Sequence, residues 1–291
     1  MRRKTTWTIL ILALLVLAAW GGHRAFVSLR PAIGVIEIDG VITDSMPYLD
    51  AIKSCGRDGS IKAVVVRLDS PGGKVGPSQE IHSALLDLKK KKPVVASLGS
   101  LGASGAYYIA CAADEIYALP GTMTGSIGVI MEFFDASEGL RRIGLSSTSV
   151  TSGALKDAGS PFRRMTEAER AYFRGLVDDV HIQFVEAVCQ ARKMRPETVK
   201  PLADGRVFTG RQAKRLGLVD RLGGLDDAVK DAAAKAHIQG EPAVERFAEG
   251  DVIRGILRRI LPWNRSVCGV GPELLDGVVG SRGIRLEYSM P

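Results

Sequence analysis

Short apolar runs alternate with segments of helical periodicity along the first half of the chain. Residues 33–38 and 62–68 are rich in β-branched side chains and end in polar or glycine-rich segments, which is typical of buried parallel strands. Between about Pro77 and Lys91, apolar residues instead recur every three or four positions, which predicts a helix with one buried face. The order strand, glycine turn, helix is the unit from which parallel sheets are built.

The same alternation repeats further along the chain. It predicts strands over residues 93–98, 116–119 and 146–150 and helices over residues 106–113 and 135–143. We therefore expect an α/β domain with a mainly parallel sheet. Its ligand site should lie at the carboxyl ends of the strands.

Beyond Pro161 the pattern becomes helical. Thr166 and Glu169 have the spacing of a capping box and predict the start of a long helix. The apolar residues that follow at helical spacing indicate either core packing or a subunit interface: Phe173, Leu176, Val177, Val180, Phe184 and Val188. Two more helices are predicted, one capped by Thr209 and one over residues 226–236. Flanking helices and a helical C-terminal part complete the expected fold.

The amino terminus differs in character from the rest of the chain. Three positive charges at residues 2–4 precede an uncharged run over residues 5–22. Eighteen helical residues rise about 27 Å, close to the roughly 30 Å of hydrocarbon in a bilayer. We expect a single-pass anchor in the bacterial inner (cytoplasmic) membrane, held in lipid through residues 5–22, with the following domain on the periplasmic side. A cleaved signal peptide, with its small-x-small site at residues 19–21, is the alternative. Both readings export the domain.

These patterns divide the chain into three parts: residues 1–30 as membrane anchor and short linker, residues 31–238 as the folded domain, and residues 239–291 as a loosely ordered tail. The net charge of +7 is spread along the chain without a nucleic-acid motif, so we expect no nucleic-acid partner. The four cysteines stand far apart without a C-x-x-C pair, so neither a zinc site nor a disulfide framework is indicated. We expect no metal or cofactor.

Ser104 is the first candidate for chemistry, because it lies in GASGAYY where a strand gives way to a helix. A hydroxyl there is presented at the sheet edge, and backbone N–H groups of the first helical turn point towards a developing oxyanion. Gly105 has no Cβ to obstruct a bound peptide. Gly73, at the end of the turn SPGG, can offer a second N–H. The simpler reading is that both glycine clusters only form tight turns.

A nucleophilic serine needs a base, and none of the four histidines is well placed. The absence of G-x-S-x-G also argues against an α/β-hydrolase triad. Lys156 remains, in the small-residue loop TSGALKDAGSP. Burial lowers a lysine pKa from about 10.4 by up to several units. Most loop lysines are solvated, however, so the residues alone leave the role of Lys156 open.

Four linked segments resemble the signal peptide peptidase A family in its short form: SPGGKVGPSQEIH, LGSLGASGAYYIACAADEIYALPGTMTGSIGVIME, SGALKDAGSP and DGRVFTGRQAKRLGLVDRLGG. The resemblance covers roughly residues 32–236 and implies a Clp protease/crotonase-like fold. It also implies that Ser104 is the nucleophile and Lys156 the general base of a Ser-Lys dyad. Gly73 and Gly105 are implied oxyanion donors, and Ser126 is implied to orient the lysine amine.

The same resemblance implies a serine endopeptidase that cleaves remnant signal peptides and other apolar segments through an acyl-enzyme. It further implies a homo-oligomer, an octamer, in which the lysine of one subunit reaches the serine of the next. Ala106 departs from the family, which often has a second glycine there. Residues 239–291 match nothing in the family; we expect this tail to lie in its own or a neighbour's substrate groove and to be trimmed.

Two other classes of function stay in view. Crotonase-type acyl-CoA enzymes share the implied fold, but they commonly rely on carboxylates and need no export anchor. A catalytically silent membrane scaffold would be favoured if the dyad were incomplete, whereas both of its members are present.

Overall fold

The computed structural model describes residues 31–247 and the backbone of residues 286–288. Residues 5–22, for which the sequence predicts a membrane anchor, lie outside these ranges. Within the described ranges, no helix is both long enough and apolar enough to cross a bilayer.

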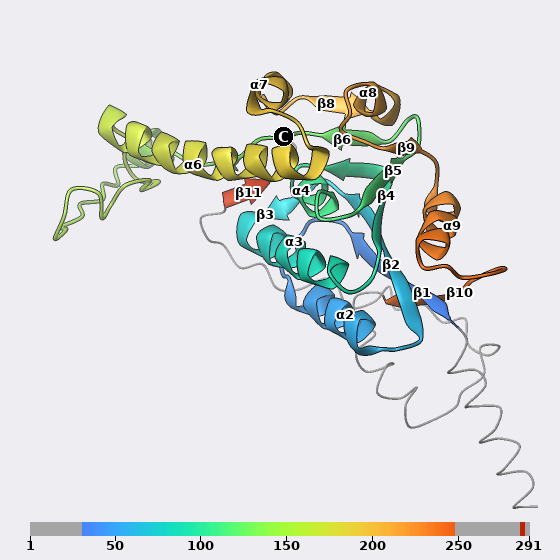
Figure 1. The fold of residues 1–291 in the computed structure, drawn as a ribbon. Coiled ribbons are helices and arrows are strands. Elements are labelled where there is room, and N and C mark those ends of the chain that lie inside the picture. Colours follow the sequence, from blue (N-terminus) through green and yellow to red (C-terminus); the bar gives the residue numbers. More distant parts are fainter. Residues whose placement is uncertain (1–30, 248–285, 289–291) are drawn as a thin grey trace, which may run out of the picture.

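An eight-stranded sheet forms the centre of the fold (Figure 1). Its main path runs β10-β1-β2-β4-β5-β9, and every pair along it is parallel. The strands of this path are β1 (Ala32–Asp39), β2 (Ile61–Ser70), β4 (Val94–Ala103), β5 (Glu115–Ala118), β9 (Arg221–Leu222) and β10 (Ala243–Phe247). Two short strands leave the path: β6 (Met123–Gly125) pairs parallel with β4, and β8 (Val207–Thr209) pairs antiparallel with β6. The expectation of a mainly parallel α/β sheet is confirmed.

Helices cover both faces of the sheet. On one face lie α2 (Met46–Arg57), α3 (Val75–Lys89) and α4 (Gly105–Ala110), and on the other lies α9 (Leu225–Lys235) (Figure 1). Strand β2 shows why its sequence is an unbroken apolar run: Val64 and Val66 pack on the α3 side while Ala63 and Val65 pack on the α9 side.

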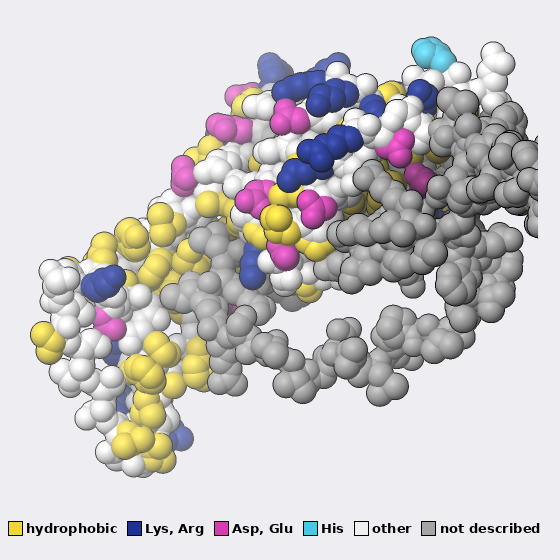
Figure 2. Space-filling view, turned by 90° about the horizontal axis from the view of Figure 1, so that it is seen from below, with side chains coloured by type: hydrophobic (Ala, Val, Ile, Leu, Met, Phe, Trp, Pro, Cys, Tyr) yellow, Lys and Arg dark blue, Asp and Glu magenta, His cyan; other side chains and the backbone are white. Residues whose placement is uncertain are grey.

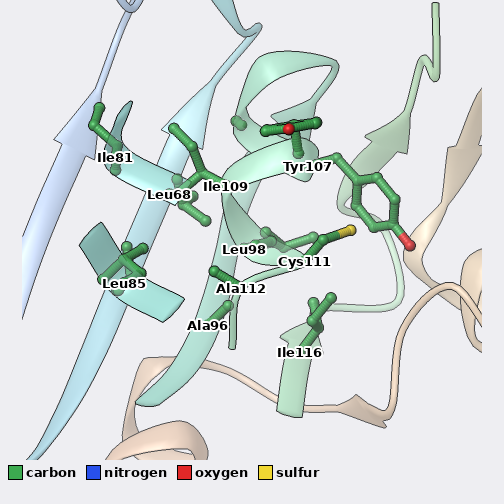
Figure 3. Packing of buried hydrophobic residues seen from close by; sticks show 14 of the residues in the cluster. Leu68, Ile81, Leu85, Ala96, Leu98, Tyr107, Ile109, Cys111, Ala112 and Ile116 are labelled. Atoms are coloured by element: carbon green, nitrogen blue, oxygen red, sulfur yellow. The ribbon is translucent and has the colours of Figure 1, made fainter. Parts of the chain in front are cut away.

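The packing on the α3 side positions helix α4. Its residues Tyr107 and Ile109 are fully buried, and Ile109 lies beside Leu68 of β2 (Figure 3). The Tyr107 hydroxyl donates a hydrogen bond to the Leu218 carbonyl at 2.8 Å. The first residues of α4 are therefore fixed against the carboxyl end of β4.

Helix α6 (Glu167–Arg192) is the longest helix of the described part, and its amino-terminal half projects away from the sheet (Figure 1). The predicted Thr166/Glu169 capping box is present. Residues 132–180, which include α5 (Ser137–Arg142), are called the arm below, and the other described residues the body. Phe184 and Val188 are buried in the body, whereas Leu176 on the arm is exposed. Core packing is thus confirmed for the body end of this apolar stripe, and a subunit interface at its arm end stays a prediction.

The remaining helical segments join α6 to the edge of the sheet. They are α7 (Pro196–Val199), a 3-10 turn (Lys200–Leu202) and α8 (Gly210–Arg215). Thr209 caps α8 as the sequence predicts, through a capping box with Gln212.

The structure differs from the sequence-based expectation in three places. Residues 146–150 form no strand and are exposed, because no neighbouring strand of the described part offers them a backbone partner. Strand β4 continues through Ala103, into the segment expected to be a turn. Two strands, β10 and β11 (Leu286–Tyr288), lie within the range expected to be a loosely ordered tail. Such pairing depends on distant partners and leaves little trace in local sequence.

An ion pair ties the body end of α6 to the sheet. The Arg192 guanidinium donates to both carboxylate oxygens of Asp220, at 2.7 Å for Nη1 to Oδ2, and to the Gly217 carbonyl at 2.9 Å. Asp220 also accepts the Ile116 N–H of β5 at 2.8 Å. Burial alone raises the pKa of the Asp220 carboxyl, but the bonds to Arg192 hold it below its ordinary value.

We expect Arg192→Met to lower the free energy of unfolding by about 3 kcal/mol, because it leaves a half-buried carboxylate without its partner. Urea unfolding of the full chain measures this loss. The matched control is Arg206→Met, which removes a solvent-exposed pair with Asp204 and should have a much smaller effect. An equal loss of unfolding free energy in the two variants would show that the Arg192–Asp220 pair stabilises the fold no more than an exposed pair does.

Candidate active site

Ser104 lies between the end of β4 and the first turn of α4. Its backbone has φ 54° and ψ −120°, a conformation that costs a non-glycine residue about 1–3 kcal/mol. The side chain is fully buried, and its Oγ has no hydrogen-bond partner among the described residues. A strained residue with an unpaired buried hydroxyl calls for an explanation beyond packing.

Ser126 lies beside Ser104 because of strand register. Ala103 of β4 pairs with Gly125 of β6, so the two serines follow paired residues at the same edge of the sheet. The Ser104 N–H donates to the Gly125 carbonyl at 2.8 Å. Ser126 is also buried and also has a positive φ, 48°. Thr124 donates its hydroxyl to the Gly102 carbonyl at 2.6 Å, which holds β6 against β4.

Gly73 lies just after the carboxyl end of β2, the strand next to β4 in the sheet. It begins β3 (Gly73–Lys74), which contacts α4. A Cβ at this position would lie 2.1 Å from the Ile42 carbonyl oxygen, so only glycine fits. That carbonyl accepts the Lys74 N–H at 2.8 Å. The structure therefore brings Gly73, Ser104, Gly105 and Ser126 together at the carboxyl end of the sheet.

Lys156 is not part of this group within one copy of the chain. It lies on the arm, in a turn where its N–H donates to the Gly153 carbonyl at 3.1 Å, and its side chain is exposed. Because the Ser104 hydroxyl has no partner within the described residues, the two do not form a hydrogen bond in the single chain.

A slot for an extended chain lies next to the glycine turn. Strand β11 pairs antiparallel with β3 on one side, opposing Tyr288 to Gly73 and Glu287 to Lys74. On its other side β11 pairs antiparallel with β7 (Ile130–Met131), opposing Glu287 to Ile130. The edges of β3 and β7 thus accept the backbone of an added strand between them.

A cavity of about 780 Å³ adjoins β7 on the arm side. Its apolar lining includes Met131, Phe133, Phe173 and Val177, with arginines around them. Strand β7 therefore borders both the slot and an apolar cavity.

His82 is the one histidine that the fold buries deeply within the described residues. Burial lowers its pKa to about 4, with a smaller contribution from Lys89. Its ring packs at a tilt against the ring of Tyr108, with 4.6 Å between the ring centroids. His82 is therefore a neutral core residue at neutral pH.

Two contributors to the site were missed from the sequence. Thr124 aligns the strand that precedes Ser126, and β7 forms one wall of the slot. The segment TGSIG contains Thr124, but nothing in its sequence reveals which carbonyl that hydroxyl meets.

Comparison with known proteins adds an independent line of evidence. The model of peptidase family S49 matches residues 86–239, more than half of the chain. A Synechocystis protein that carries a protease name is 40% identical over 237 residues, covering 77% of this chain and 85% of that protein. An Enterococcus faecium protein that carries the name signal peptide peptidase SppA is 33% identical over 224 residues, covering 72% of this chain and 65% of that protein.

Among solved structures, a mutant of the 1510-N membrane-bound stomatin-specific protease has a TM-score of 0.48 at 16% identity, covering 75% of this chain and 97% of that chain. The family match and the two sequence relatives agree with each other and with the motifs around Ser104. The chain belongs to peptidase family S49, the signal peptide peptidase A family.

Proposed function

We propose that this chain is a membrane-anchored serine endopeptidase that cuts apolar peptides with Ser104 as nucleophile and Lys156 of a neighbouring copy as general base. The observation that carries the proposal is the strained, buried Ser104, whose unpaired hydroxyl lies at the end of β4. Its neighbouring strand β3 forms one wall of a slot that pairs with extended backbone.

In this mechanism the neutral amine of Lys156 accepts the proton of the Ser104 hydroxyl as Oγ attacks the peptide carbonyl carbon. The N–H groups of Gly73 and Gly105 stabilise the oxyanion. The carbon–nitrogen bond then breaks, and the lysine ammonium gives its proton to the leaving amine. Water, deprotonated by the same amine, hydrolyses the acyl-enzyme. Ser126 orients the amine.

The need for a second copy follows from the position of Lys156. The single chain buries Ser104 in the body and leaves Lys156 exposed on the arm. Exposed apolar side chains gather on the arm (Figure 2) and favour its packing against another subunit. They are Phe134, Ile143, Leu145, Val150, Leu155, Phe162, Tyr172 and Leu176. We propose a homo-oligomer, an octamer by family resemblance, in which each arm delivers its lysine to a neighbour's serine.

The substrate class follows from the slot and the cavity. Backbone pairing with β3 and β7 selects extended peptides rather than an acyl-CoA. The apolar lining beside β7 suits apolar side chains. Remnant signal peptides and other apolar segments meet both conditions. An anchor over residues 5–22 in the bacterial inner membrane would hold the domain near them on its periplasmic side.

Ser104→Ala and Lys156→Ala should each abolish cleavage of an apolar fluorogenic peptide while leaving circular dichroism and assembly unchanged. Co-expression of the two variants should restore part of the activity, because mixed oligomers contain subunit contacts that join an intact serine to an intact lysine. Lys90→Ala, an exposed lysine of the body, is the control and should stay fully active. Retained activity in either single variant would contradict the Ser-Lys dyad. If the co-expressed variants recovered no activity, formation of the dyad across subunits would be contradicted.

Ser104→Gly should raise the free energy of unfolding by about 1 kcal/mol, because glycine relieves the backbone strain at this position. The same variant should be inactive. Lys193 also has a positive φ, 51°, at the end of α6. Lys193→Gly should therefore stabilise the chain without loss of activity. Thermal unfolding together with peptidase assays separates the two effects, and a Ser104→Gly variant less stable than the parent would show that the strain does not exist.

The tail strand provides a further test. Glu287→Pro removes an N–H and breaks the pairing of β11, whereas Glu287→Ala keeps the backbone intact. If β11 competes with substrate for the slot, Glu287→Pro should lower the KM for added peptide about fivefold, as expected for one lost hydrogen bond of about 1 kcal/mol. Glu287→Ala should leave KM unchanged. Equal KM values in both variants and the parent would exclude competition by the tail.

A further inference from the structure

The Arg163 side chain links two separate parts of the arm. Its Nε donates to Asp157 Oδ2 at 2.8 Å, and its Nη2 donates to the Asp157 main-chain carbonyl, also at 2.8 Å. Along the adjacent edge of the guanidinium, Nη1 donates to Glu169 Oε2 at 2.9 Å and Nη2 donates to Glu169 Oε1 at 2.5 Å. A guanidinium with two donors on each partner fixes orientation as well as distance.

Glu169 provides the rigid end of this link. Its side chain is 5% exposed, and its carboxylate also accepts the Thr166 N–H at 2.9 Å in the capping box. The bonds from Arg163 and from Thr166 hold the pKa of Glu169 at about 2. The carboxylate is therefore charged at any pH at which a peptidase of this kind works, and it is fixed to the first turn of α6.

Asp157 provides the other end, and it directly follows Lys156. Arg163 grips both the carboxylate and the main-chain carbonyl of Asp157, so it fixes the backbone next to the lysine. Two further contacts lie just beyond. Gly159 approaches Phe133 so closely that a Cβ would lie 2.6 Å from its ring, and the Ala136 N–H donates to the Pro161 carbonyl at 2.7 Å.

We propose that Arg163 is the positioning residue of the general base: it sets the place of Lys156 by tying Asp157 to the start of α6. The inference rests on the proposed function, because it takes Lys156 to be the base. Arg163 does not touch the reacting atoms. It acts on the backbone from which the long, flexible lysine side chain extends, and so limits where the amine can go.

This role has a kinetic signature. The nucleophile and the strand-binding slot both lie on the body, whereas Arg163 lies on the arm, where it also borders the cavity beside β7. Loss of the clamp should therefore reduce kcat more than it changes KM, and Asp157→Ala, at a residue outside the cavity lining, should reduce kcat alone. Because misplacement of a catalytic group by about 1 Å can cost on the order of a hundredfold, we expect kcat to fall by between tenfold and a hundredfold in Arg163→Gln.

The experiment compares Arg163→Gln with Arg141→Gln in the full-length chain. Arg141 is an arginine of α5 on the same arm; it pairs with Glu138 at the surface and does not line the cavity beside β7. The readouts are kcat, KM, the sedimentation of the assembly, and the rate at which a fluorophosphonate labels Ser104. The labelling rate reports activation of the serine independently of peptide binding. We expect slow turnover and slow labelling in Arg163→Gln alone, with an assembly like that of the parent.

Chemical rescue separates positioning from a merely structural role. In Arg163→Ala, added methylguanidine should restore part of the turnover and labelling rate, because it can again bridge Asp157 and Glu169. Asp157→Ala keeps the Arg163–Glu169 pair and the capping box, so it remains informative if Arg163 variants fail to assemble. It should lower kcat without changing KM.

The outcomes distinguish this inference from the proposed function. Full activity in Lys156→Ala would remove the general base and with it both proposals. Loss of activity in Lys156→Ala, with parental kcat and labelling rate in either an assembled Arg163→Gln or Asp157→Ala, would overturn the role of Arg163 alone. A fall in kcat that the Arg141→Gln control shares equally would also overturn it.

Discussion

The hydrogen bond from the Ser104 N–H to the Gly125 carbonyl holds together the part of the structure on which the site depends. It joins the ends of β4 and β6 where Ser104 adopts a backbone conformation that few residues tolerate. The burial of Tyr107 fixes α4 on the other side of the serine. The strain at Ser104 can persist because strand pairing and helix packing act on it from both sides.

Much of the fold could be predicted from sequence because the signals for its helices and strands are local. The apolar run of β2 reflects burial on both faces, and the capping box at Thr166 and Glu169 marks the start of α6 within a few residues. The position of Ser104 at the junction of strand and helix follows from the same alternation. In each case the signal lies in the residues of the element itself and does not depend on a distant partner.

The parts that could not be predicted depend on distant partners. The sequence of residues 146–150 is typical of a strand, but a strand needs a neighbour, and the described residues supply none. Conversely, β7 and β11 are too short to be recognised and exist only through pairing. Lys156 is the clearest case: its loop composition permits burial, yet in the single chain the side chain is exposed. In the proposed mechanism Lys156 meets Ser104 of a second copy, and no local sequence pattern encodes such a contact.

The separation of body and arm gives the proposed enzyme a safeguard. A single chain carries a nucleophile without its base, so it should not cut peptides before assembly. The slot then imposes a second condition, because a peptide must be extended to pair with both β3 and β7. A signal peptide in the bilayer satisfies its backbone groups as a helix. On leaving the membrane it loses that environment, and the slot offers new backbone partners on both of its edges. Under the proposed function, unpaired backbone would therefore contribute to selection alongside the apolar side chains that suit the cavity beside β7.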